Sequence, residues 1–147
     1  MLADAEWNEK KVLDRRTSRD HVLKGVSGGF AQLCHGKEAP LKRMNPDDWI
    51  IYYSPKQNLK DDAPYQKFTA VGEVSDNRVY KVHAGEGFSP YRRKINFLKC
   101  RETPIHPFIP NLSFIKNKRH WGYSFRFGHI EISEHDFKLI VKQMVKI

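Results

Sequence analysis

The chain has 147 residues, a length that favours a single domain with its own hydrophobic core. Its two cysteines, Cys34 and Cys100, are too few for a disulfide framework and form no CxxC pair for a structural zinc site, and no apolar run is as long as a membrane span. With 26 Lys and Arg against 17 Asp and Glu, the formal net charge is +9 at pH 7, which favours a polyanionic partner.

Residues 1–17 are poorly patterned, because their few large apolar side chains are surrounded by charges. We expect a loose arm or a weak edge strand there, and a folded domain over residues 18–147. The first residues include acids and lack an apolar segment, so they do not resemble a secretion signal. We therefore expect a cytoplasmic protein.

A short helix is predicted over Ser18–Ser27. Ser18 is a suitable N-cap, and Val22 and Val26 lie one turn apart on one face. The glycine pair that follows is typical of a helix end. Residues 30–44 mix apolar, basic and proline residues without a clear period, so we expect mostly loop with a helical turn near Leu41.

The middle of the chain carries strand patterns. The continuous apolar run Trp49–Tyr53 predicts a buried central strand. Phe68–Val74 and Arg78–His83 predict two strands of a hairpin, because the residues 75–77 between them are typical of turns. Arg93–Leu98 alternates between apolar and polar residues and predicts another strand.

The C-terminal third is expected to contain one strand and one helix. Prolines between residues 104 and 110 exclude a long helix there. Ser124–Ile132 predicts the last strand. Ser133 and Asp136 resemble a capping box, and Phe137–Val145 has helical apolar spacing. Short strands with an early helix and a terminal amphipathic helix predict an α+β fold built on a small mixed β-barrel.

Two aromatic segments are the strongest functional signals. One is Trp49–Pro55, preceded by His35-Gly36-Lys37, and the other is Trp121–Gly128. Tryptophan and tyrosine offer flat faces for stacking, arginine offers a planar charged group, and glycine lets a ligand approach the backbone closely. This combination suits a flat polar ring beside a phosphate, which points to a nucleic-acid base.

The order of the motifs is as informative as the motifs themselves. Along the chain they are Ser18-Arg19-Asp20-His21-Val22, Gly28-Gly29-Phe30, His35-Gly36-Lys37, Trp49–Pro55, Arg92-Arg93 and Trp121–Gly128 followed by Glu131-Ile132. In this order they resemble the EVE domain, a member of the PUA-like superfamily that is related to the YTH readers of methylated adenosine. The resemblance covers about residues 18–144. It implies a PUA-like barrel whose concave pocket receives a flipped-out, modified base in DNA or RNA.

One departure concerns the first strand. The EVE family opens with a strand of the type Trp-Ile-x-Val-x-Ser just before the Arg-Asp-His motif. Here three consecutive charged residues, Asp14, Arg15 and Arg16, precede that motif and disfavour a half-buried strand. We therefore expect a weakened first strand and a changed pocket wall.

Trp121 is the first candidate for stacking on a base. Gly122 beside it favours a ligand wall over a core tryptophan, since a core strand has little use for glycine. Without the resemblance, Tyr53-Ser54-Pro55 is better explained as an ordinary strand end, and His35-Gly36-Lys37 is a weak signal because such surface loops are common. The candidate base-pocket residues are Ser18, Arg19, His21, Phe30, His35, Gly36, Lys37, Tyr53, Ser54, Pro55, Trp121 and Gly122.

Basic runs flank the aromatic segments and predict a surface that follows phosphates, although such runs are more often solvated faces. Arg126, which is also a candidate for this surface, could hold a pocket loop or pair with an acid such as Glu131. The candidate phosphate contacts are Arg92, Arg93, Lys116, Lys118, Arg119 and Arg126.

The favoured hypothesis is a non-catalytic module that binds a modified base in DNA or RNA, without a metal or cofactor. An alternative is a nucleic-acid-processing enzyme in which histidines, Asp20 and Lys37 could supply acid–base groups. The sequence shows no Ser-His-Asp or metal-ligand spacing, no deaminase signature and no glycine-rich phosphate loop. A second alternative is a protein-interaction adaptor on the same scaffold.

Overall fold

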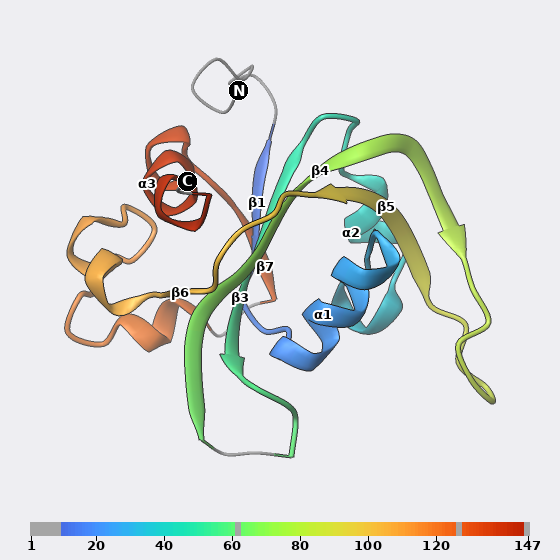
Figure 1. Cartoon of the computed structure of the whole chain (residues 1–147), viewed down its shortest axis with the longest axis horizontal. Coiled ribbons are helices and arrows are strands. Elements are labelled where there is room, and N and C mark those ends of the chain that lie inside the picture. The colour runs from blue at the N-terminus through green and yellow to red at the C-terminus, as the bar shows by residue number, and fades with distance from the viewer. Residues whose placement is uncertain (1–9, 61–62, 126–127, 146–147) are drawn as a thin grey trace.

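The computed structural model describes residues 10–60, 63–125 and 128–145, except the side chain of Cys34. Within these ranges a seven-stranded mixed sheet has the order β2-β5-β4-β3-β1-β7, and β6 pairs with β4 (Figure 1). The strands are β1 (Lys11–Asp14), β2 (Phe30–Ala31), β3 (Trp49–Lys56), β4 (Pro64–Lys81), β5 (Tyr91–Phe97), β6 (Thr103–Pro104) and β7 (His129–Ile132). The helices are α1 (Arg19–Gly28), α2 (Ala39–Lys42) and α3 (Glu134–Met144), and the 3₁₀ turns are η2 (Cys34–Gly36), η3 (His106–Asn111) and η4 (Trp121–Phe125).

The fold class predicted from the sequence is confirmed: strands and helices form an α+β fold around a mixed sheet. The sheet is open rather than closed, because β2 and β7 end the strand order without pairing with each other within the described ranges. Helices α1 and α2 cover one face of the sheet, and α3 with η3 covers the other (Figure 1). Of the helices in the described ranges, none is long and apolar enough to cross a membrane.

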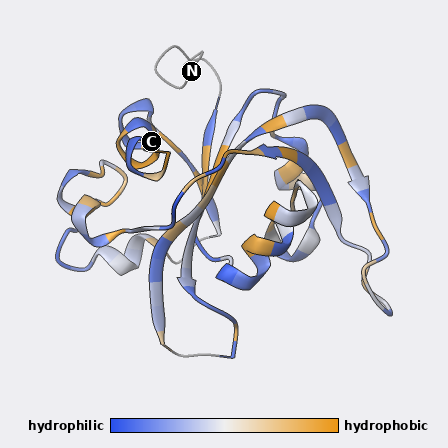
Figure 2. Ribbon diagram, in the orientation of Figure 1, coloured by the Kyte–Doolittle hydropathy of each residue, from blue (hydrophilic) through white to orange (hydrophobic). Residues whose placement is uncertain are grey.

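The predicted central strand is confirmed as β3, which lies between β1 and β4. Its side chains alternate between two apolar clusters, with Trp49, Ile51 and Tyr53 on the side of α3 and with Ile50 and Tyr52 on the side of α1. Figure 2 shows hydrophobic residues gathered where the central strands cross. A strand covered on both faces needs a continuous apolar run, and this explains the sequence pattern.

The expected loose arm or edge strand over residues 1–17 is corrected at residues 11–14, which form β1, whereas residues 1–9 lie outside the described residues. Strand β1 lies inside the sheet, parallel to β3 and antiparallel to β7, and all four of its residues are buried. Val12 and Leu13 supply one side chain to each apolar cluster. Asp14 ends the strand, where its carboxylate accepts hydrogen bonds from the backbone of Arg16 and from Thr17. Two apolar residues, together with a final aspartate whose carboxylate is hydrogen-bonded, are therefore enough for a strand inside the sheet.

The predicted hairpin over Phe68–Val74 and Arg78–His83 is wrong. Phe68–Val74 and residues 78–81 of the second segment belong to the single long strand β4, which pairs with β5 on both sides of residues 75–77. The pairing shifts register between Val74 and Val79, where β4 bends (Figure 1). Arg93 of β5 donates from Nε to the carbonyl oxygen of Asp76 at 3.1 Å, so the polar triplet forms an irregularity within a strand instead of a turn.

The helix predictions are confirmed, whereas the last strand is shorter than expected. Gly29 ends α1 with a left-handed φ of 71°. The Ser133 hydroxyl caps α3 by accepting a bond from the Asp136 amide at 3.2 Å, and the apolar face of α3 is buried. Strand β7 begins only at His129, because the preceding residues 121–125 form the 3₁₀ turn η4.

Candidate functional site

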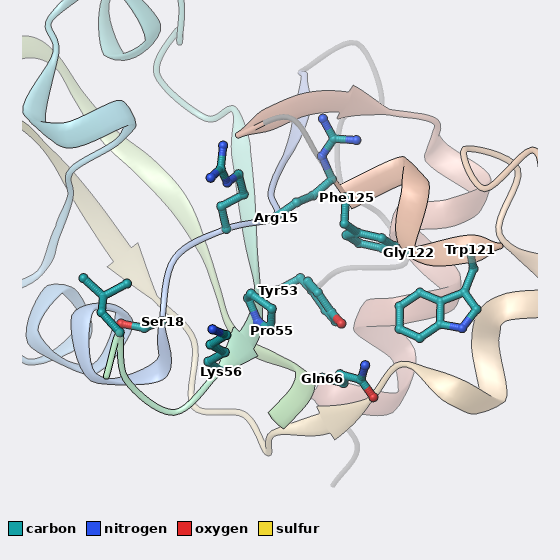
Figure 3. Close-up of a pocket in the computed structure, with 11 residues that line it drawn as sticks. Arg15, Ser18, Tyr53, Pro55, Lys56, Gln66, Trp121, Gly122 and Phe125 are labelled. Atoms are coloured by element: carbon teal, nitrogen blue, oxygen red, sulfur yellow. The ribbon is translucent and has the colours of Figure 1, made fainter. Parts of the chain in front are cut away.

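A pocket of about 390 Å³ opens where β3 ends and η4 begins. The segment between β1 and α1, the end of β3, the start of β4 and η4 all contribute to it, so its walls come from distant parts of the chain (Figure 3). We call it the η4 pocket. Its lining residues are Arg15, Arg16, Ser18, Tyr53, Pro55, Lys56, Leu59, Gln66, Trp121, Gly122 and Phe125.

Aromatic rings form one wall of the η4 pocket. The half-buried indole of Trp121 meets the ring of Phe125 edge to face, with centroids 5.7 Å apart and an interplanar angle of 84°. Phe125 in turn lies 4.6 Å from the ring of Tyr53. Behind Trp121, the ring of His106 packs against the indole at 5.5 Å. The contacts of Trp121 with Phe125 and His106 are edge to face, a favoured geometry for aromatic pairs, whereas Phe125 and Tyr53 are tilted at 41°; together these contacts hold the wall in place.

Two polar groups that are not used in hydrogen bonds within the described ranges point into the η4 pocket. The hydroxyl of Tyr53 and the carboxamide of Gln66 face the side of the pocket where the Trp121 indole lies (Figure 3). Neither group has a hydrogen-bond partner within the described ranges. Burial raises the pKa of the Tyr53 phenol, so this group stays protonated and can both donate and accept a hydrogen bond.

Three basic residues line the η4 pocket and differ in how far they are exposed to solvent. Arg16 is exposed and Lys56 is half-buried, whereas Arg15 is only 3% exposed. The Arg15 guanidinium donates through Nη1 to the carbonyl oxygen of Ser124, and its backbone amide donates to the carbonyl oxygen of Gly128 at 2.8 Å. Arg15 therefore ties β1 to the segment that carries Trp121.

Several buried hydrogen-bond donors of residues that line the η4 pocket are unpaired within the described ranges. The Nε and Nη2 atoms of Arg15 and the hydroxyl of Ser18 are shielded from solvent and have no partner in the described part of the chain. Burial lowers the pKa of Arg15, against the attraction of Asp14. An arginine remains a cation even so. The wall of the η4 pocket thus contains an incompletely paired positive charge.

Arg19 was predicted in the base pocket, but its side chain is committed elsewhere. It binds Glu102 through Nε at 2.7 Å and through Nη2 at 3.0 Å, and Tyr65 donates its hydroxyl to the same carboxylate at 2.6 Å. Burial alone would raise the pKa of Glu102, but the bonds from Arg19 and Tyr65 outweigh it and leave that pKa below its ordinary value. This network fixes the start of α1 against β4, next to Ser18 and Gln66.

Of the predicted base-pocket residues, the structure brings five together: Ser18, Tyr53, Pro55, Trp121 and Gly122 line the η4 pocket. Ser54 does not, which corrects its prediction. It is fully buried, and its hydroxyl shares a hydrogen bond of 2.8 Å with Thr69, because its side chain alternates to the opposite face from that of Tyr53.

The motif His35-Gly36-Lys37 and Phe30 lie outside the η4 pocket, on the side of the molecule formed by β2 and β5. Gly36 has a φ of 83°, and a Cβ there would lie 2.4 Å from the Cβ of Pro90, so close packing explains this glycine. His35 and Lys37 are exposed, as is His21 on α1. The ring of Phe30 supports the guanidinium of Arg92 at 3.8 Å.

The predicted phosphate contacts fall into different environments. Arg93 is 2% exposed and donates to the carbonyl oxygens of Leu41, Met44 and Asp76, so its prediction is corrected: inside the fold the guanidinium joins α2 and the residues after it to β4. Arg92 is half-buried and bonds Gln32 at 3.0 Å. The exposed basic residues before η4 are Lys116, Lys118 and Arg119, while Arg126 lies outside the described residues.

Sequence reasoning missed part of the lining. Phe125 lies within an aromatic segment already singled out, and Lys56 follows Pro55 directly, so both were within reach of the motifs. Arg15 and Arg16 were interpreted only as an obstacle to a strand. Leu59 and Gln66 carried no signal, because only the folding of β4 beside β3 brings Gln66 to the pocket.

Comparison with known proteins decides the family. The EVE domain family model matches residues 6–143. The chain belongs to the EVE domain family. Curated relatives of this EVE chain include a UPF0310 protein of Mycolicibacterium vanbaalenii, 48% identical over 128 residues that cover 87% of this chain and 88% of the relative. A UPF0310 protein of Mycobacterium avium is also 48% identical, over 127 residues that cover 86% and 92% of the two chains.

Among solved structures, the EVE chain is similar in fold to the YTH domain of the Zygosaccharomyces rouxii MRB1 protein, which was crystallised in complex with N6-methyladenosine RNA. The TM-score is 0.63 at 15% sequence identity, and the similarity covers 94% of this chain and 88% of the YTH chain. At this identity the comparison establishes the shared fold.

Proposed function

We propose that this EVE chain is a non-catalytic module that binds DNA or RNA and receives a flipped-out, modified base in the η4 pocket. One observation carries the proposal: a pocket of about 390 Å³ has an aromatic wall formed by Trp121, Phe125 and Tyr53 and is edged by Arg16 and Lys56. Rings that stack on a base and cations that attract its phosphates are the two requirements for holding an extruded nucleotide.

The energies are compatible with this mode of binding. Extruding a base from a duplex costs a few kcal/mol, and stacking on one aromatic side chain contributes about 1–3 kcal/mol. Hydrogen bonds to the base edge and contacts to phosphate supply the remainder. Because one buried methyl contributes only about 0.8 kcal/mol, a modified base is favoured strongly only if the unmodified base also leaves a polar group unpaired.

The comparisons support the same proposal. Membership of the EVE family and a fold shared with a YTH domain that binds N6-methyladenosine RNA both favour a nucleic-acid ligand. The net charge of +9 fits a polyanion as well.

The arrangement of titratable groups favours binding over catalysis. Ser113, His135 and Asp136 come together, but the Ser113 hydroxyl donates directly to Asp136 at 2.8 Å and His135 approaches the same carboxylate through Nδ1 at 2.8 Å. The imidazole therefore does not stand between the hydroxyl and the carboxylate, as a catalytic triad requires. Asp136 also accepts the amides of Ser113 and Phe114, which gives it a structural role in the first turn of α3.

The test is a titration of Trp121→Ala with fluorescently labelled oligonucleotides that carry one central unmodified, methylated or hydroxymethylated base. Loss of the stack is expected to weaken binding by about 5- to 150-fold, which corresponds to about 1–3 kcal/mol. Tyr123→Ala is the matched control, because Tyr123 belongs to the same turn, is 63% exposed and does not line the pocket.

The proposal would be contradicted if the wild-type chain and Trp121→Ala bound every oligonucleotide with equal affinity and if salt abolished this binding. Binding of that kind is electrostatic attraction alone. Conversion of any of these oligonucleotides to a product would contradict the non-catalytic assignment.

A further inference from the structure

Gln66 has an unusual backbone for its position. It lies within β4, yet its φ is 56°, in the left-handed region that disfavours residues other than glycine. Two other non-glycine residues of the described chain share a positive φ, His35 and Asp47, and both lie outside strands. A strand residue held in this conformation indicates that the surroundings enforce it.

The cause is a bulge opposite Pro55. In the pairing of β3 with β4, Ser54 stands opposite Lys67 and Lys56 opposite Pro64, so Tyr65 and Gln66 together face the single residue Pro55. Proline has no backbone N–H and cannot donate to the ladder at this point. The carbonyl oxygen of Gln66 instead accepts the amide of Ile105 at 3.1 Å.

The bulge changes the direction of two neighbouring side chains. Tyr65 turns to Glu102, to which it donates its hydroxyl, whereas Gln66 turns into the η4 pocket (Figure 3). Bulges commonly redirect a side chain beside a functional site in this way. The redirected carboxamide has no partner within the described ranges, although it is half-buried.

We propose that Gln66 reads the edge of the base held in the η4 pocket. Its carboxamide exchanges two hydrogen bonds with a neighbouring acceptor and donor on the ligand, and the Tyr53 hydroxyl forms a third. This inference rests on the proposed function and adds the chemical class of the ligand: a flat nitrogen heterocycle that presents a donor next to an acceptor, as opposed to any ring that can stack.

The carboxamide suits this task because it has one donor group and one acceptor group in a single plane. It can turn by half a rotation to exchange the two, so Gln66 on its own accepts the donor–acceptor edges of several bases. It discriminates against a stacked ring that offers no such edge, since the ligand then covers the carboxamide and leaves its polar groups unpaired. The contribution of Gln66 should therefore appear only when a base occupies the pocket.

The experiment compares two single-stranded oligonucleotides that are identical except that the central nucleotide is a methylated base in one and an abasic residue in the other. Gln66→Gly removes the carboxamide and accepts the left-handed backbone. Gln66→Glu keeps the length of the side chain but removes the donor. Asp47→Gly is the matched control, because it makes the same change at a positive φ of 72° outside the pocket.

The measured quantity is the ratio of the two affinities, base over abasic, for each variant. Gln66→Gly and Gln66→Glu are expected to reduce this ratio at least about tenfold, the effect of leaving one hydrogen-bonding edge unpaired. Asp47→Gly is expected to leave the ratio unchanged. Thermal unfolding of both glycine variants should show intact folding, since relief of the left-handed strain offsets the added freedom of the unfolded chain.

Three results would overturn the inference. They are an unchanged ratio in both Gln66 variants, equal weakening on the base and abasic probes, and a Gln66→Glu variant that behaves like the wild type. Any of these, combined with binding that still depends on Trp121, would leave the proposed function standing. Binding that does not depend on Trp121 would refute the proposed function itself.

Discussion

Asp14 and Arg15 are consecutive charged residues that fold into the interior beside the η4 pocket. Their exposed fractions are 4% and 3%. Burial raises the pKa of the Asp14 carboxyl to about 6, although hydrogen bonds from Thr17 and Arg16 and the charge of Arg15 oppose this rise. A carboxyl group with such a pKa changes its charge within an accessible range of pH, which makes its cost to stability measurable.

The variant Asp14→Asn tests how much the buried carboxylate lowers the free energy of unfolding. The unfolded chain releases the proton near pH 3.8 and the folded chain near pH 6, so the folded state binds more protons between these values and stability falls as pH rises through them. Relative to Asp14→Asn, the wild type is expected to lose up to about 3 kcal/mol of unfolding free energy between pH 4 and pH 6.5. Denaturant unfolding at several pH values measures this difference, and parallel curves would contradict it.

At the scale of elements, α1 and α3 begin with serines that look alike in the sequence and act differently. The Ser133 hydroxyl accepts the Asp136 amide at the start of α3, whereas Ser18 makes no side-chain cap at the start of α1 and has a buried hydroxyl without a partner in the described part of the chain. The N-cap position is therefore evident from the sequence, but the cap bond depends on the surroundings.

Replacement of each serine by alanine should separate the two cases. Ser133→Ala is expected to cost about 1 kcal/mol of unfolding free energy, the usual value of an N-cap bond. Ser18→Ala removes a hydroxyl that caps nothing and should change the same quantity by less than about 0.5 kcal/mol. Unfolding by urea measures both, and equal losses would show that Ser18 also caps α1 in solution.

At the scale of the whole molecule, exposed positive charge occurs in separate segments. Lys116 and Arg119 are exposed in the segment that leads into η4, whereas Arg78 and Lys94 are exposed on β4 and β5. If a base enters the η4 pocket, we expect its flanking phosphates to contact the first pair, because these residues precede Trp121 in the chain. The location of the pocket would then decide which charges contribute to binding.

The salt dependence of binding tests this arrangement. Each phosphate contact contributes a slope of about −0.9 for duplex DNA, or about −0.7 for a single strand, to the plot of log affinity against log salt. The double variant Lys116→Gln, Arg119→Gln is expected to make this slope less negative by about 1.4 to 1.8. The control double variant Arg78→Gln, Lys94→Gln should retain the wild-type slope, and the opposite result would place the polymer on the β4–β5 side.

The sequence predicted the aromatic part of the candidate site, but it did not predict the roles of all of the polar residues. The aromatic segments indicated stacking on a flat ring, and Tyr53, Pro55 and Trp121 do line one pocket. Arg93 and Gln66 were not predictable. The first looked like a phosphate contact but binds carbonyl groups of residues 41, 44 and 76, and the second carried no motif at all.

The sequence by itself determined the features that depend on nearby residues: the α1 and α3 helices, the apolar run of β3, the net charge and the aromatic segments. Apolar periodicity and capping residues act over a few positions, so they are visible along the chain. Only the tertiary structure decided which charges are buried, where β4 bends and that Gln66 faces the pocket. The physical reason is that burial, strand pairing and hydrogen-bond partners are set by residues that are distant along the chain, such as Pro55 opposite the bulge of β4.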